Sequence, residues 1–165
     1  MPITTSPLTY DQLKRYIEKK HTIKVIELPD LELLRKHHNR IMGKDIELVS
    51  SVHAYNAYCH GSKTNLIYLC PSSDIISPLR ALAHEYFHAL CRKAEIPGKY
   101  VLEEQIAVGL DGGIDPRTVY ILPDPKLEEV VPNDVLLSLL FLYHDVEKEL
   151  NRLGYYKAIE EENGL

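Results

Sequence analysis

The stretch that most constrains the fold is an apolar segment that opens with Ser77 and Pro78 and contains the pentapeptide His-Glu-Tyr-Phe-His, starting at His84. Serine followed by proline is typical of a helix start. The serine side chain caps a free N–H group, and proline lacks the N–H that the first helical residue would leave unpaired. We therefore expect a helix over about 78–95. On it, His84 and His88 would lie one turn apart on the same side.

Two imidazoles placed in this way can bind one zinc ion, and the glutamate between them can serve as a general base beside the metal. The pattern therefore makes His84 and His88 candidate Zn²⁺ ligands and Glu85 the candidate catalytic residue. The alternative is that both histidines are partly buried helix residues with ordinary hydrogen-bond partners. A third ligand on a neighbouring element would favour the metal site.

The chain after this helix offers that ligand. Pro97 and Gly98 predict a reversal, and a second helix is expected over about 100–111, with Glu103 and Glu104 in its first turns. A catalytic zinc site needs three protein ligands and one open position, so either carboxylate could complete it. Either could also be there because the positive end of a helix dipole favours acidic residues.

This pair of helices resembles the zincin metallopeptidases of the gluzincin type, which carry H-E-x-x-H on one helix and E-x-x-A on the next. Glu104 and Ala107 match the second motif, whereas a frame that begins at Glu103 places Ile106 at the alanine position. The order of elements also resembles that of compact metallopeptidase domains of the ImmA/IrrE type. The third histidine that follows the motif in metzincins is absent.

The resemblance implies that His84, His88 and Glu104 are the metal ligands and that Glu85 is the general base. It implies a zinc-dependent endopeptidase that hydrolyses peptide bonds of a protein or peptide substrate through a zinc-activated water. Two other functions remain open at this point. One is a non-catalytic zincin-like module that binds a protein, and the other is a metal-dependent hydrolase of a non-peptide amide or ester.

Two further expectations concern the substrate. The strand expected over 65–70 precedes the motif helix, and the resemblance implies that an extended peptide adds to the edge of such a strand. The developing oxyanion needs a donor besides the metal. Tyr120, Tyr143 and His144 lie downstream, in regions that could fold over the cleft, and are the candidates.

The pattern predicts an α+β class for the rest of the chain. The resemblance implies a minimal zincin-like domain in which a small antiparallel or mixed sheet packs on helices. A Thr9-x-x-Gln12 capping box predicts the first helix. The other expected elements are a strand over 21–28, a helix over 30–41, strands over 46–55 and 65–70 joined by a hairpin connection over 56–63, a core helix over 134–153, and a frayed tail over 155–165.

Composition narrows the remaining possibilities. A length of 165 residues suits a single domain, and a net charge of −5 with interspersed signs argues against a nucleic-acid-binding surface. No apolar run reaches the length of a membrane span, and no secretory signal is visible, so a cytoplasmic protein is expected. The three cysteines, an odd count at no paired spacing, favour free thiols over one disulfide plus a free thiol. Cys59, His60 and Cys70 could form a structural zinc site, but no paired C-x-x-C spacing supports it.

Overall fold

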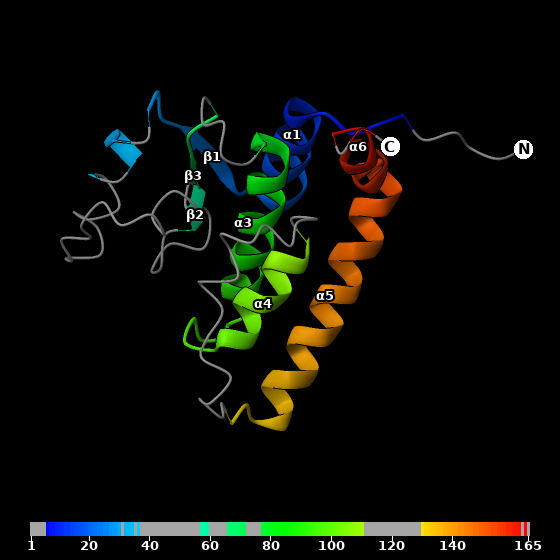
Figure 1. Ribbon diagram of the computed structural model, residues 1–165. Helices are drawn as coiled ribbons and strands as arrows, with labels where there is room; N and C mark the ends of the chain where they lie inside the picture. The colour runs from blue at the N-terminus through cyan, green and yellow to red at the C-terminus, as the bar shows by residue number, and fades with distance from the viewer. Residues whose placement is uncertain are drawn as a thin grey trace, which may run out of the picture.

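The computed structural model describes residues 6–30, 32–34, 36, 57–59, 66–71, 77–110, 130–162 and 164. Helices dominate this part of the chain and a small sheet lies to one side of them, so the predicted α+β class is confirmed (Figure 1). The elements are α1 (Tyr10–His21), β1 (Lys24–Glu27), β2 (Ala57–Cys59), β3 (Leu66–Leu69), α3 (Pro78–Lys93), α4 (Val101–Leu110), α5 (Asn133–Leu153) and α6 (Tyr155–Glu162).

The helix ends follow local sequence signals. Thr9 and Gln12 form the predicted capping box at the start of α1, with reciprocal side-chain and backbone hydrogen bonds. Ser77 caps α3 by accepting a hydrogen bond of 3.2 Å from the backbone N–H of Arg80. Gly154 ends α5 with a φ of 93°, a left-handed conformation that glycine adopts without steric cost. The predicted helices that carry the site residues are therefore confirmed.

The sheet has the order β1-β3-β2. β1 runs parallel to β3, with Lys24 opposite Leu66, while β2 runs antiparallel to β3, with Ala57 opposite Leu69. Of the two expected arrangements, antiparallel or mixed, the antiparallel one is wrong, because β1 and β3 run in the same direction and the described sheet is mixed.

The hairpin connection expected over 56–63 is also wrong in part, because residues 57–59 form β2. Polar neighbours and a glycine favoured a turn there, yet pairing with β3 makes these three residues a strand. The strand expected over 46–55, and most of the helix expected over 30–41, lie outside the residues that the structure describes.

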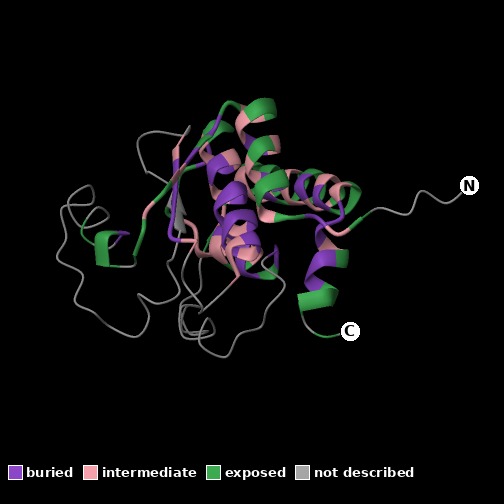
Figure 2. Ribbon diagram, turned by 90° about the horizontal axis from the view of Figure 1, so that it is seen from above, coloured by how far each residue is buried: buried purple, intermediate pink, exposed green. Residues whose placement is uncertain are grey.

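The hydrophobic core is built around α3. The sheet and α1 lie against different sides of this helix, and α4 and α5 also contact it (Figure 1). Leu82, Tyr86 and Phe87 have almost no exposed surface, and Figure 2 shows α3 buried over most of its length. A helix surrounded in this way is held rigidly, which suits an element that positions a functional site.

The C-terminal segment is part of this core, so the frayed tail expected over 155–165 is wrong for most of its length. Tyr155, Ala158 and Ile159 are buried on one side of α6. The Tyr155 hydroxyl donates a hydrogen bond of 2.6 Å to the carbonyl of Leu110, at the end of α4. The acidic composition of the segment suggested fraying, although it also contains a short apolar face. A helix this short is stable only because that face packs on the rest of the fold.

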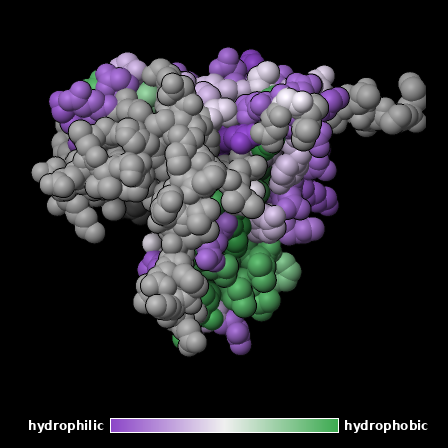
Figure 3. Space-filling view, viewed as in Figure 1, coloured by the Kyte–Doolittle hydropathy of each residue, from purple (hydrophilic) through white to green (hydrophobic). Residues whose placement is uncertain are grey.

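Helix α5 is buried along one side only. Leu139, Val146 and Leu150 face the core, whereas Leu137, Leu140 and Phe141 are exposed. Figure 3 shows apolar side chains gathered over the N-terminal half of this helix. Within the described ranges, no helix combines the length and the apolar character that crossing a bilayer requires.

Candidate metal centre

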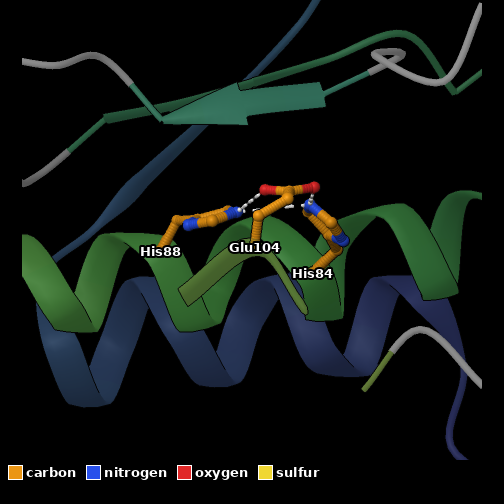
Figure 4. Close-up of side chains that lie close together, drawn as sticks. All are labelled: His84, His88 and Glu104. Carbon is orange, nitrogen blue, oxygen red and sulfur yellow. Dashed lines mark hydrogen bonds and ion pairs between the residues drawn. The ribbon is translucent and has the colours of Figure 1, made fainter. Parts of the chain in front are cut away.

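Three side chains from two helices converge on one point (Figure 4). His84 and His88 lie one turn apart on α3, and Glu104 reaches them from the first turn of α4. One carboxylate oxygen of Glu104 lies 3.0 Å from His84 Nε2, and the other lies 2.7 Å from His88 Nε2. The structure therefore brings together the three residues that the sequence motifs selected as ligands.

The donor atoms of these three side chains lie close enough together to hold one metal ion. Ligand atoms about 2.0 Å from zinc at tetrahedral angles lie about 3.3 Å from one another. The Nε2 atoms of His84 and His88 are 3.3 Å apart. The oxygens of Glu104 lie slightly closer to the two nitrogens, as expected for hydrogen bonds, so a small outward shift of this carboxylate would accommodate the ion. The three side chains are 12, 16 and 22 % exposed in chain order, so solvent reaches the cluster.

The cluster shifts the pKa values of its members in opposite directions. Burial alone would lower the pKa of His88, but hydrogen bonds to Glu103 and Glu104 outweigh it and raise the pKa to about 9. Burial opposes ionisation of Glu104, yet hydrogen bonds to His84 and His88 hold its pKa well below the usual range. Each ring nitrogen of His88 thus lies within hydrogen-bonding distance of a carboxylate, and a proton on Nε2 would have to leave for a metal to bind there.

Glu103 was the alternative third ligand, and the structure places it elsewhere. Its carboxylate lies behind His88, where Oε2 is 2.5 Å from His88 Nδ1, the ring nitrogen turned away from Glu104. Its other oxygen accepts a hydrogen bond from Arg92. Two neighbouring residues of α4 therefore contact opposite edges of the same imidazole. Sequence reasoning missed Arg92, although its position one turn after His88 indicates that it lies on the same side of α3.

Glu85, the candidate general base, is buried with 4 % of its surface exposed. Its negative charge contributes to the raised pKa of His88, so the carboxylate lies within electrostatic range of the cluster. Of the three oxyanion candidates, His144 is exposed on α5 and Tyr143 lies one residue before it on the same helix. A hydrogen bond to Glu147 raises the pKa of Tyr143 to about 12. Tyr120 lies outside the described residues.

The second possible zinc site gains no support from the part of the chain that the structure describes. Cys70 is buried and forms no disulfide, while the side chain of Cys59 and all of His60 lie outside that part. Cys91 is also buried and forms no disulfide, as the odd cysteine count predicted. Burial raises the pKa of the Cys91 thiol, which keeps it protonated and suits a packed side chain better than a ligand.

Comparison of the chain with protein-family models, with curated proteins and with solved structures found no match. A proposal of function therefore rests on the residues and their geometry. Two features carry the most information: three metal-ligating side chains supplied by two helices, and the buried carboxylates beside them.

Proposed function

We propose that this chain is a zinc-dependent endopeptidase of the gluzincin type, with His84, His88 and Glu104 as metal ligands and Glu85 as general base. The observation that carries the proposal is the separation of the two Nε2 atoms, which equals the ligand spacing of a tetrahedral site, with a carboxylate facing both. Two histidines and one glutamate leave the fourth position open, which is the arrangement of catalytic rather than structural zinc sites. We further propose that it acts inside the cell on a protein or peptide.

Each residue has a distinct part in this proposal. Zinc would supply Lewis-acid chemistry, polarising a substrate carbonyl and making water acidic near neutral pH. Glu104 holds the two imidazoles in place through its paired oxygens. Glu85 accepts a proton from the attacking water and returns it to the leaving amine. Its position supports this role, because Glu85 directly follows His84 on α3 and its charge acts on His88.

The strand to which a peptide substrate could add is not the one expected from the sequence. Strand addition was expected at 65–70, but β3 is the central strand of the described sheet, and β1 and β2 occupy both of its edges. An extended peptide therefore cannot pair with β3. Among the described strands, β2 lies at the edge of the sheet and also contacts α3, the helix that carries the two histidines. We propose β2 as the strand to which the peptide adds.

The proposal is tested by measuring zinc and proteolysis on the same preparations. We expect the wild type, purified without added metal, to contain zinc in proportion to protein. Glu104→Gln should lose the metal, because an amide is a far weaker ligand than a carboxylate. Glu85→Gln should keep the metal and lose cleavage by at least about a hundredfold, since a general base contributes at least that much. Inductively coupled plasma mass spectrometry and a proteome-wide cleavage comparison give the two readouts.

Glu161→Gln is the matched control, because it makes the same chemical change at an exposed carboxylate on α6. It should behave like the wild type in both assays. Wild-type protein without zinc, under conditions in which added zinc also fails to bind, would contradict the metal site. Zinc binding without any cleavage that depends on Glu85 would contradict the peptidase and favour the protein-binding module.

A further inference from the structure

Glu103 is a buried carboxylate to which the proposed reaction assigns no role. Only 4 % of its surface is exposed, and it lies between one imidazole and one guanidinium. Oε2 is 2.5 Å from His88 Nδ1, and Oε1 accepts a hydrogen bond from Arg92. A carboxylate is costly to bury without such partners, so both contacts stabilise this side chain inside the fold.

The reversal between α3 and α4 lies against Arg92, the last residue in the series of contacts from His88 through Glu103. A Cβ atom added at Gly98 would overlap Nη1 of Arg92, so the turn lies directly against the guanidinium. The φ angle of Gly98 lies outside the left-handed region, so the backbone itself would accept another residue there. A side chain at this position would therefore require the Arg92 guanidinium, which also contacts Glu103, to shift.

We propose that Glu103 is a positioning residue that sets the metal affinity of the site by holding His88 with Nε2 directed at the metal, and that Arg92 and Gly98 hold Glu103 in turn. This inference rests on the proposed metal site and extends it. An imidazole can present either nitrogen to a metal, and the hydrogen bond made by the other nitrogen decides which one. By accepting the Nδ1 proton, Glu103 orients the ring and makes Nε2 a better ligand.

The alternative is that Glu103 only neutralises Arg92. That role would be satisfied by the guanidinium alone and would leave the imidazole free to rotate. The observed contact instead occupies the one nitrogen of His88 that does not face Glu104. The two roles therefore differ in what happens to His88 when Glu103 is weakened.

The experiment compares three variants with the wild type. Glu103→Gln removes the charge and keeps the shape. Gly98→Ala keeps every polar group and displaces only Arg92. Gly109→Ala is the matched control, because a Cβ there meets nothing within 4 Å. Zinc affinity is measured by competition with a chelator of known affinity. In the metal-free protein, the Nδ1 proton of His88 is followed by NMR as a downfield signal whose exchange with water reports the hydrogen bond.

We expect Glu103→Gln to bind zinc about 10–100-fold more weakly, the range for loss of such partners. Gly98→Ala should weaken zinc binding in the same direction by less, and both variants should accelerate exchange of the Nδ1 proton. Gly109→Ala should change neither readout. Unchanged zinc affinity and unchanged proton exchange in both Glu103→Gln and Gly98→Ala would overturn the proposal. Failure of the wild type to bind zinc would refute the metal site instead, while the exchange measurement would still decide whether Glu103 orients His88.

Discussion

The two sides of α3 differ in the kind of side chain that they present to their neighbours. The side that carries Leu82 and Tyr86 is apolar, and the Tyr86 hydroxyl meets His21 at the end of α1, 2.8 Å away. The side that faces α4 carries His84 and His88, whose partners are the carboxylates of that helix. One side therefore gains stability by removing hydrocarbon from water, whereas the other buries charge that is tolerable only in matched pairs.

The difference shows how a small domain can position a reactive site. Apolar packing is not directional, and it fixes α3 without specifying what its polar side must do. The polar side is directional: Glu104 and Glu103 contact opposite edges of one imidazole, so a small rotation of α4 would break both contacts. The packing of the apolar side thus keeps α3 rigid, and the contacts of the polar side depend on that rigidity. Three predictions test this division.

The largest effect is expected on the apolar side. Leu82→Ala should lower the free energy of unfolding by about 2–5 kcal/mol, because it removes a fully buried side chain and leaves a cavity. Urea denaturation of the metal-free protein measures this loss. The zinc affinity of the folded variant should stay close to that of the wild type. A large loss of zinc affinity would show that the two sides are not separable.

The charged groups on the polar side should make the free energy of unfolding depend on pH. The pKa of His88 in the metal-free fold is raised to about 9, above the value of about 6.5 expected in the unfolded chain. Its stabilising contribution is therefore complete below about pH 6.5 and is lost as the pH rises through 9. We expect the free energy of unfolding to fall by roughly 1–3 kcal/mol over this interval.

His88→Gln is the control for this pH dependence, because it removes the titrating group. Its unfolding free energy should change less than that of the wild type over the same pH interval. Zinc binding at pH 7.5 should also release protons, which calorimetry in buffers of different ionisation enthalpy detects. Equal pH dependence in both proteins would show that the raised pKa of His88 does not stabilise the fold.

The smallest effect is expected at a polar contact inside the hydrophobic core, between α6 and the end of α4. Tyr155→Phe removes the hydrogen bond to the carbonyl of Leu110 and should lower the unfolding free energy by about 1 kcal/mol. Thermal denaturation is sufficient to measure it. Because Leu110 ends the helix that carries Glu104, a slight loss of zinc affinity is also expected. If neither the free energy of unfolding nor the zinc affinity changes, the hydrogen bond from α6 does not stabilise the position of α4.

Much of the site could be predicted because its signals are local. The start of α3 at Pro78, the spacing of His84 and His88, and the position of Glu104 early in the next helix all follow from short-range patterns. The E-x-x-A match favoured Glu104 as the ligand, but the contact of Glu103 with Nδ1 of His88 could not be predicted. The two glutamates are neighbours in sequence, and only the angle at which α4 packs on α3 decides which one faces Nε2 and which one faces Nδ1.

The same distinction applies to the fold. By itself, the sequence determined where most helices begin and end, because capping residues, proline and glycine act within a few positions of one another. The tertiary structure alone decided that β1 pairs parallel with β3, that residues 57–59 form a strand, and that the acidic C-terminal segment folds back as α6. These features depend on contacts between residues far apart in the chain, where burial and pairing outweigh local preference.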